Sequence, residues 1–372
     1  MKLPYLFSPF NLSDLTLPSR IVMAPMTRSR TNQPGNVPNE MMAKYYSQRA
    51  SAGMMITEAT QISQQGQGYS FTPGIHSQEQ IEGWKKVTQA VHEKGGRIFL
   101  QLWHVGRMSH ESFHPDGSPI APSAIAPGAR VWVVGANGKG EMVECPTPRA
   151  MSLNDIRDVI EQFRLGARNA ITAGFDGVEI HGANGYLLDQ FMRSTSNKRT
   201  DEYGGSLENR IRFAVEVAKA VADEVGVKRT GIRLAPFIKQ RGMDDPESDR
   251  AILAAAKEFE KIGIAYIHLA EADWDDAPTV PESFRHELRA CFSGAIIVAG
   301  NYTPQKAESL LESNLIDLAA FGRPFIANPD YPARIQHDYP LSQFDGDSLF
   351  GGTEKGYNDH PFYQFSKGVN LS

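Results

Sequence analysis

Eight short runs of mainly apolar residues recur along the chain, and each has the length of a buried strand. They span residues 21–25, 53–57, 97–102, 176–181, 230–236, 265–270, 294–300 and 316–323. Between them lie stretches with apolar residues at helical spacing, among them 39–51, 78–94, 247–262, 281–292 and 304–313. Ser152 and Ser206 are good N-caps for two further helices. This α/β alternation predicts a (β/α)8 TIM barrel, because a doubly wound sheet would rarely need eight such units.

Two segments depart from this rhythm. Residues 1–20 alternate apolar and small polar positions and close at Pro18, which predicts a short N-terminal hairpin over one barrel end. Residues 104–150 are rich in Gly, Pro and Ser and contain a hairpin pattern around 131–143, with a turn at Ala136-Asn137-Gly138. We interpret 104–150 as a capping excursion after the third strand, within a single domain that spans 1–372. The tail after 335 is expected to pack on the barrel mouth or on another subunit.

Composition and charge restrict the class of protein. A formal charge of −5 without a basic block argues against nucleic acid and anionic membranes as partners. No apolar run is long enough to span a bilayer, and the N-terminus lacks an apolar core of signal-peptide length. Cys145 and Cys291 lie far apart, which excludes a disulfide framework and a cysteine-ligated cluster. A cytoplasmic protein is therefore expected.

The most chemically dense stretch follows the fourth predicted strand. His181 and Asn184 can donate hydrogen bonds, and Tyr186 carries a weakly acidic phenol. Two glycines between them let the backbone turn sharply. In a parallel barrel this strand end belongs to the face where active sites lie. Taken alone, however, the cluster is better explained by satisfied polar residues in a structural loop.

Other predicted strands also end in polar residues, which in a barrel converge on one face. The set is Thr27, Glu58, Gln101, His181, Asn184, Tyr186, Arg233, Asn301 and Arg323. Arg233 lies in an apolar strand and needs a partner, because an unpaired buried charge costs several kcal/mol. Ala299-Gly300-Asn301 and Phe321-Gly322-Arg323 follow strands seven and eight, where barrels bind phosphate, although ordinary turn glycines remain the alternative. His104, His110 and His114 have no metal-ligand spacing.

Several motifs together resemble the old yellow enzyme family of FMN-dependent ene-reductases, over nearly the whole chain. The branch that is most similar holds the N-ethylmaleimide, nitroester and xenobiotic reductases. The matching stretches are Met23-Ala24-Pro25-Met26-Thr27-Arg28, Ser51-Ala52-Gly53, Thr57-Glu58-Ala59-Thr60, Gln101-Leu102-Trp103-His104, His181 to Leu188, Asn197 to Arg210, and Phe321-Gly322-Arg323-Pro324.

The resemblance implies a cofactor, a reaction and a role for each site residue. FMN would be reduced by NADPH or NADH, and its N5 would pass a hydride to α,β-unsaturated carbonyls, maleimides and nitro compounds. His181 and Asn184 would bind the substrate oxygen, and Tyr186 would donate the proton. Residues implied to hold FMN are Pro25, Thr27, Ala59, Gln101, Arg233, Gly300, Asn301, Gly322 and Arg323. Residues implied to line the substrate cavity are Tyr69, Trp103, Gln240, Trp274 and Tyr357.

The chain departs from some relatives in two places. It carries the His-x-x-Asn form of the substrate motif rather than His-x-x-His, and Met142 aligns where some relatives have an arginine in the capping hairpin. Alternative barrel functions are a hydroxy-acid oxidase or an aldolase, although no strand end carries a Schiff-base lysine. A flavin-binding protein without catalysis is the non-enzyme alternative. The expected partner is a small electrophile, and the expected assembly is a monomer or homodimer.

Overall fold

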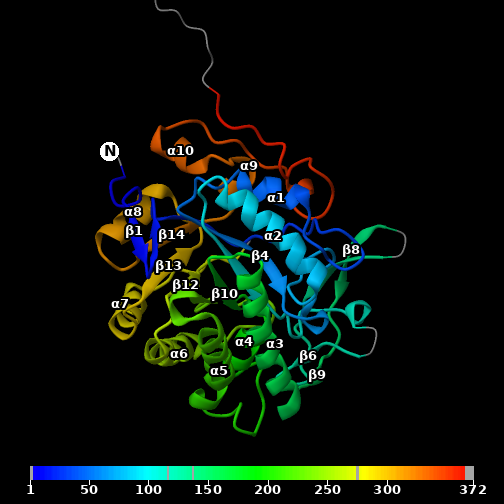
Figure 1. Cartoon of the computed structure of the whole chain (residues 1–372). Coiled ribbons are helices and arrows are strands. Elements are labelled where there is room, and N and C mark those ends of the chain that lie inside the picture. The colour runs from blue at the N-terminus through cyan, green and yellow to red at the C-terminus, as the bar shows by residue number, and fades with distance from the viewer. Residues whose placement is uncertain (1–2, 115–116, 136–137, 274–275, 365–372) are drawn as a thin grey trace, which may run out of the picture.

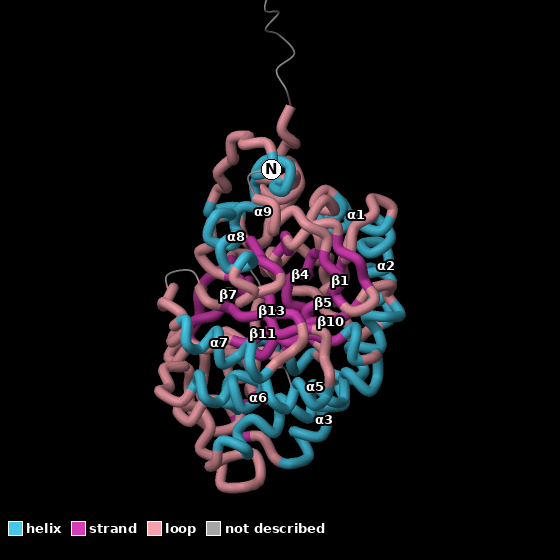
Figure 2. The backbone as a smooth tube through the Cα atoms, turned by 90° about the vertical axis from the view of Figure 1, so that its left-hand side faces the viewer, coloured by secondary structure: helices cyan, strands magenta, loops and turns pink. Residues whose placement is uncertain are grey.

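The computed structural model describes residues 3–114, 117–135, 138–273 and 276–364, and its centre is a closed barrel of eight parallel strands. The strands are β3 (Ile21–Met23), β4 (Met54–Gln61), β5 (Ile98–Trp103), β10 (Gly177–Gly182), β11 (Thr230–Leu234), β12 (Tyr266–Ala270), β13 (Ala295–Ala299) and β14 (Leu318–Phe321). Pairing of β5 with β10 and of β14 with β3 closes the ring. Figure 2 shows the strands at the centre with helices around them. The predicted TIM barrel is confirmed.

Seven helices occupy the predicted positions between strands. They are α1 (Glu40–Ser47), α2 (Gln78–His92), α3 (Leu153–Thr172), α5 (Leu207–Val225), α6 (Ser248–Ile262), α7 (Glu282–Cys291) and α8 (Pro304–Glu312). Ser152 and Ser206 cap α3 and α5 as predicted, each accepting a backbone hydrogen bond from the third residue of its helix. Gly263 ends α6 in the left-handed conformation that lacks a steric cost for glycine.

Three short helices were not predicted. They are α4 (Leu187–Met192), α9 (Arg323–Ala327) and α10 (Tyr331–Gln336). Every residue of α4 is buried, so it shows no alternation of apolar and polar faces that a sequence pattern could reveal. The predicted strand 316–323 is shorter than expected, because β14 ends at Phe321 and Arg323 already begins α9.

The N-terminal hairpin closes the amino end of the barrel. Its strands are β1 (Phe10–Leu12) and β2 (Leu15–Leu17), which pair antiparallel. Leu12 and Leu17 pack in one cluster with Val22, Phe99 and Tyr266 of the barrel interior. Leu12 and Leu17 are almost fully buried, so the hairpin covers apolar side chains of the barrel interior at this end.

The segment 104–150 and the C-terminal segment lie at the carboxyl end. Within 104–150, β7 (Arg130–Val134) and β8 (Gly140–Glu144) form the predicted hairpin, and β6 (Ile120–Ala121) pairs with β9 (Arg149–Ala150). Gly138 of the predicted turn has φ 73°, whereas Ala136 and Asn137 lie outside the described residues. Arg28, Arg30 and Arg49 donate to backbone carbonyls between 348 and 357, which fixes the C-terminal segment beside α1 (Figure 1).

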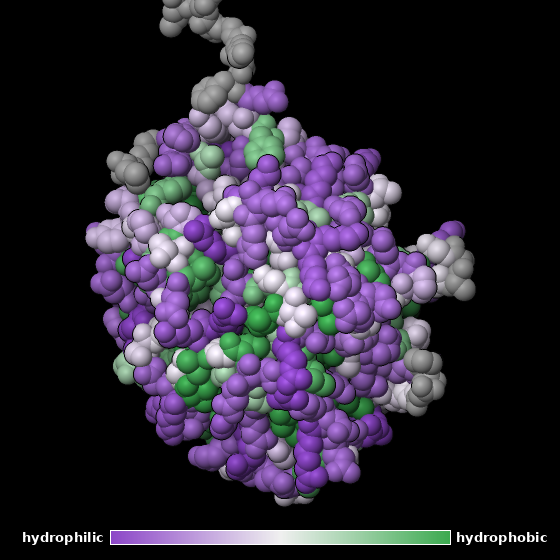
Figure 3. Space-filling model, in the orientation of Figure 1, coloured by the Kyte–Doolittle hydropathy of each residue, from purple (hydrophilic) through white to green (hydrophobic). Residues whose placement is uncertain are grey.

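The outer surface is mainly hydrophilic. Hydrophilic residues cover most of the face in Figure 3, and hydrophobic residues appear between them in smaller groups. None of the helices in the described part of the chain is long and apolar enough to cross a membrane.

Candidate active site

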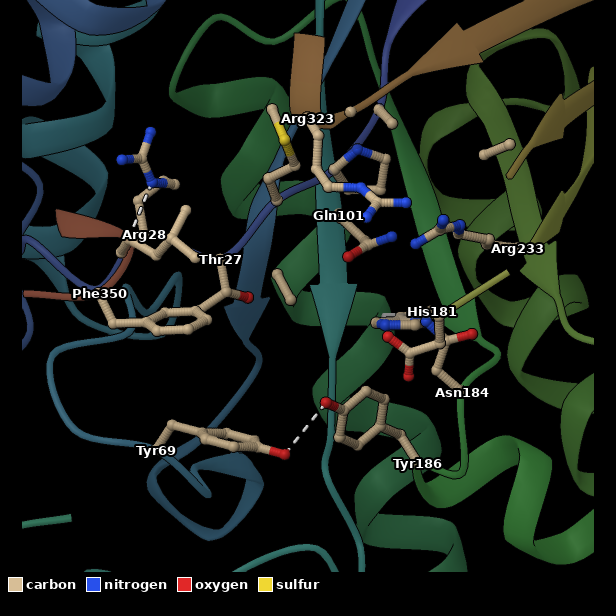
Figure 4. A pocket seen from close by; sticks show the side chains of 18 of the residues that line it. Thr27, Arg28, Tyr69, Gln101, His181, Asn184, Tyr186, Arg233, Arg323 and Phe350 are labelled. Atoms are coloured by element: carbon tan, nitrogen blue, oxygen red, sulfur yellow. Dashed lines mark hydrogen bonds between the residues drawn. The ribbon is translucent and has the colours of Figure 1, made fainter. Parts of the chain in front are cut away.

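A cavity of about 440 Å³ opens at the carboxyl ends of the barrel strands. This volume lies in the range of small-molecule and cofactor sites. Figure 4 shows that side chains from the ends of many strands point into it. Of the residues singled out in the sequence, those that line the cavity are Pro25, Thr27, Ala59, Tyr69, Gln101, Trp103, His181, Asn184, Tyr186, Arg233, Gly300, Asn301, Gly322 and Arg323. Residues at strand ends that are far apart in the sequence thus lie together at the carboxyl face of the barrel, as expected for this fold.

Two of the expected cavity residues do not line the cavity, and a third is not among the described residues. Tyr357 requires a correction, because its ring is fully buried and stacks on Tyr45 with centroids 4.1 Å apart. Leu349 and Phe350 of the same C-terminal segment line the cavity instead. Gln240 does not line the cavity, whereas the next residue, Arg241, does. Trp274 lies outside the described residues. A loop sequence has no regular periodicity, so it does not indicate which of two adjacent residues points into the cavity.

Arg233 is a buried cation with an open hydrogen-bond donor. Its Nε atom is buried and has no partner among the described residues. Burial lowers the pKa of Arg233, and the nearby Glu179 carboxylate opposes that shift. Because an arginine stays charged under ordinary conditions, its open donor favours a carbonyl-rich or anionic group in the cavity.

Glu179 is the buried acid beneath the cavity. Its carboxylate accepts from Gln101 Nε2 at 2.8 Å and lies 2.8 Å from His268 Nδ1. Burial opposes ionisation of Glu179, but His268, Arg233 and Gln101 outweigh it and lower its pKa. The bond from Gln101 engages the amide nitrogen, so the amide oxygen of Gln101 remains as an acceptor for a ligand N–H.

His181 is held in a single neutral form by its surroundings. Burial, aided by the cations Arg233 and Arg241, lowers its pKa well below the ordinary value. The backbone N–H of Ala183 donates to His181 Nδ1 at 3.4 Å, which makes Nδ1 the acceptor and leaves the proton on Nε2. A neutral imidazole with Nε2–H is therefore a hydrogen-bond donor toward the cavity.

Asn184 and Tyr186 follow on the same loop. The Asn184 side-chain oxygen is buried without a partner among the described residues, and Asn184 lines the cavity. The phenol oxygens of Tyr186 and Tyr69 lie 3.2 Å apart, as Figure 4 shows. Burial raises the pKa of Tyr186, so the phenol is protonated at neutral pH and can donate a proton. These side chains combine oxygen recognition with a proton source.

The turns after β13 and β14 lie beside each other at one end of the cavity. Arg323 Nη2 donates to the side-chain oxygen of Asn301 at 2.5 Å. A buried network supports the turn after β13 from behind: Arg285 makes two bonds to Glu271, at 2.7 and 2.8 Å, and Tyr302 also donates to that carboxylate. Because an added Cβ at Gly300 would come within 3.3 Å of the Glu271 Cβ, the Gly300 backbone lies directly on this support.

Glu58 has a different role from the other polar strand ends. Its fully buried carboxylate accepts from the backbone N–H groups of Arg28 and Ser29, both at 3.2 Å, and from Tyr46 Oη at 3.3 Å. Glu58 does not line the cavity. It holds the loop that carries Thr27, whose side chain points into the cavity in Figure 4.

His104 and His114 of segment 104–150 are both buried. No group of His, Cys, Asp and Glu suited to a metal ion occurs among the described residues. His104 is fully buried, and burial lowers its pKa to about 3. His114 accepts or donates a 2.8 Å bond with Ser109, and burial lowers its pKa to about 4. Both are therefore neutral side chains of the folded protein.

These two histidines are expected to make the fold less stable in mild acid. Each stays neutral when folded but takes up a proton when unfolded below its ordinary pKa of about 6.5, so the unfolded state gains as the pH falls. His114→Gln should reduce the loss of unfolding free energy between pH 7 and 5.5 by about 1 kcal/mol. Urea titrations at the two pH values measure this, and an unchanged pH dependence in the variant would contradict it.

Several cavity residues were missed by the sequence reasoning. Arg241 and Asp273 line the cavity from the loops after β11 and β12, and Trp132 and Arg130 reach it from the capping hairpin. Polar residues after strand ends were the available signal, and Asp273 fits that rule. Met142 also lines the cavity. Some relatives have an arginine at the position of Met142. In this chain the cation at the cavity side of the hairpin is Arg130 instead.

The residues present fit FMN. An open arginine donor and an amide acceptor on Gln101 suit the hydrogen-bonding edge of a flavin. Two glycine turns beside Arg323 suit a phosphate at the other end of the cavity. The aromatic wall of Tyr69 and Trp103, with rings 5.6 Å apart, suits a planar ligand.

Comparisons with known proteins agree with this arrangement. The sequence profile of the NADH:flavin oxidoreductase / NADH oxidase family matches residues 5–342. The chain is 42% identical to 12-oxophytodienoate reductase 2 of Arabidopsis thaliana, over 96% of this chain and 95% of that protein. It resembles the structure of morphinone reductase in complex with tetrahydroNAD, with a TM-score of 0.94 and 47% identity over 98% of this chain and 99% of the other. The old yellow enzyme homologue of Zymomonas mobilis gives a TM-score of 0.92 and 40% identity, over 97% and 100% of the two chains.

Proposed function

Because the chain belongs to the old yellow enzyme family of FMN-dependent oxidoreductases, we propose that it reduces activated C=C bonds with electrons from NADPH or NADH. The proposed substrates are α,β-unsaturated carbonyls, maleimides and nitro compounds. One observation carries this proposal: His181, Asn184 and Tyr186 line one cavity, where two oxygen-binding groups lie next to a protonated phenol.

The residues proposed to hold FMN fall into two groups. Pro25, Thr27, Ala59, Gln101 and Arg233, which all line the cavity, would hold the ring. Gly300, Asn301, Gly322 and Arg323 would hold the phosphate. When bound, FMN accepts two electrons from the nicotinamide and supplies a hydride to the β-carbon of the substrate. The protein contributes orientation and electrostatics.

His181 and Asn184 would bind the carbonyl or nitro oxygen of the substrate. Donors fixed at the position where negative charge develops lower the barrier, as in an oxyanion hole. A neutral His181 donating from Nε2 suits this role, because its proton is not lost near neutral pH. Tyr69 and Trp103 would pack against the substrate in the same cavity.

Tyr186 would donate the proton to the α-carbon. Its phenol stays protonated in the buried cavity, and Tyr69 can donate to the Tyr186 oxygen and leave the Tyr186 proton for the substrate. The structure of morphinone reductase with tetrahydroNAD supports a nicotinamide as the electron donor. A small electrophile is the proposed partner, and the proposed setting is the cytoplasm, as a monomer or homodimer.

The spectrum of the purified protein tests the proposal. A yellow protein that is bleached by NADPH or NADH without oxygen, and recoloured by 2-cyclohexenone, would support it. A colourless protein that takes up no added FMN would refute it. Maleimide and nitroalkene substrates can replace cyclohexenone in the same assay to define the substrate class.

Thr27→Ala is expected to lower the reduction potential of bound FMN by roughly 30–65 mV. In the proposed site the Thr27 hydroxyl donates a hydrogen bond to a carbonyl of the flavin ring. This bond becomes stronger when reduction places negative charge on the ring, and hydrogen bonds to charged groups are worth roughly 1.5–3 kcal/mol. For two electrons, about 1.4 kcal/mol corresponds to about 30 mV. Dye-equilibration titration measures the shift.

Thr230→Ala is the matched control, because Thr230 is a buried threonine at the amino end of β11 whose hydroxyl donates to the Gly226 carbonyl. It should cost stability without changing the potential. A Thr27→Ala shift below about 10 mV, well under the value from the bond energy, would remove Thr27 from the flavin site.

A further inference from the structure

Arg241 contacts three consecutive residues of the loop after β10. Its Nη1 donates to the backbone carbonyl of Asn184 at 2.9 Å. Its side-chain carbons pack on Gly185, where an added Cβ would lie 3.1 Å from the Arg241 Cβ. Its guanidinium lies over the Tyr186 ring, 5.6 Å from the centroid. One side chain thus spans the whole stretch that carries the proposed substrate-binding amide and the proposed proton donor.

The backbone of that loop is one that needs external support. Asn184 and Gly185 both have positive φ, 54° and 79°, a region that side-chain-bearing residues rarely adopt. On one side, the Gly185 N–H donates to Asp189 at 2.9 Å. On the other side, Arg241 binds the Asn184 carbonyl. The two bonds together fix the direction in which the Asn184 amide and the Tyr186 phenol leave the backbone.

Arg241 is itself held in place. Its guanidinium bonds to Asp273 at 2.5 Å, and the two side chains are only 17% and 11% exposed. Its own carbonyl accepts from Arg107 Nη2 at 3.1 Å. A pre-oriented guanidinium can therefore hold the loop without large movement. Its charge also opposes the effect of burial on the pKa of Tyr186.

We propose that Arg241 is a positioning residue that, anchored by Asp273, holds the Asn184–Tyr186 loop in the conformation that presents the amide and the phenol to the substrate. This inference rests on the proposed function, because it assigns the support of two residues that act there. Arg241 acts through Asn184 and Tyr186 and takes no part in the transfer of the hydride or the proton.

The test compares Arg241→Met, Arg241→Lys and Lys239→Met in the FMN-loaded protein. Methionine keeps an unbranched apolar stem but removes the charge and the donors, whereas lysine keeps the charge and one donor centre. Lys239 is the matched control, because it lies two residues away in the same loop, pairs with the exposed Asp244 and does not line the cavity. The first readout is the affinity for 4-hydroxybenzaldehyde, a phenol whose binding to FMN-loaded protein is followed by a long-wavelength charge-transfer band.

Arg241→Met should weaken phenol binding and slow reoxidation by 2-cyclohexenone by about tenfold or more, the scale of a lost hydrogen bond to a charged group. Arg241→Lys should recover part of both, and Lys239→Met should match the wild type. FMN content should not change in any variant, and Lys239→Met should also leave the rate of flavin reduction unchanged. Phenol affinity within about twofold of the wild type in Arg241→Met, or an equal loss in Lys239→Met, would overturn the proposal.

Two further variants keep the test decisive. If Arg241→Met does not fold, Asp273→Asn leaves the arginine but weakens its anchor, and unchanged phenol affinity there overturns the proposal. In a Tyr186→Phe background, Arg241→Met should slow cyclohexenone turnover less than in the wild type, because the two residues act together. An equal cost in both backgrounds would contradict action through Tyr186.

The outcome also separates this inference from the proposed function. If the wild-type protein binds FMN and phenols but is not reoxidised by any enone, the proposed function fails, and the phenol affinities still decide the role of Arg241. If the wild type reduces enones and the Arg241 variants behave as Lys239→Met, only the positioning role fails.

Discussion

Phenylalanine in place of Tyr186 is expected to slow the reduction of 2-cyclohexenone by about 10²–10⁴-fold, the usual contribution of a general acid. The phenol is buried and protonated in the cavity, and removal of its hydroxyl leaves no other proton donor on the Asn184–Tyr186 loop. Reduction of the flavin by NADPH or NADH needs no proton from this group and should be nearly unchanged. Stopped-flow measurement of the two half-reactions separates these effects.

The chain offers a matched control for this variant. Tyr203 is 8% exposed, as is Tyr186, and its hydroxyl donates to Glu216 away from the cavity. Tyr203→Phe should leave both half-reactions intact. Quinones, which need no protonation at carbon, should remain good substrates of Tyr186→Phe. Equal losses in both half-reactions would refute the role of Tyr186 as the proton donor.

The second large effect is expected at Asn184. Loss of one donor to a developing oxyanion costs roughly 2.7–4 kcal/mol, or about 10²–10³-fold in turnover. Asn184→Ala should therefore lose most enone reduction and phenol binding, while FMN still binds through the residues on the other strands. Absorbance titration with a phenol and steady-state turnover with 2-cyclohexenone measure the two losses.

The backbone at Asn184 requires a second variant. With φ 54°, Asn184 occupies a conformation that asparagine and glycine tolerate better than alanine. Asn184→Gly removes the amide without that strain and should show the same loss as Asn184→Ala. Asn184→His restores a donor and should recover part of the activity. If Asn184→Gly keeps the phenol affinity of the wild type, the amide does not bind the substrate oxygen.

The barrel was predictable because its signal is local. Each strand is short, apolar and followed by a helix whose apolar residues recur every three or four positions, and serine N-caps mark where α3 and α5 begin. The same periodicity could not reveal α4, because its residues are buried on all sides. Tyr357 was expected in the cavity from the family resemblance, but Leu349 and Phe350 line it instead, because loop residues have no period that shows which of them faces inward.

The sequence by itself determined the order of the eight barrel strands and the helices between them, the family, and most of the polar residues that the barrel brings to one face. It did so because each strand end, each glycine turn and the His181–Tyr186 motif is a short run of consecutive residues. Only the tertiary structure decided how these groups are paired. Glu179 turns out to orient Gln101, Glu58 to hold the loop of Thr27, and Arg241 to contact the Asn184–Tyr186 loop. Each of these contacts joins residues 20 or more positions apart, and the distance between such residues is set by barrel closure, which no local pattern encodes.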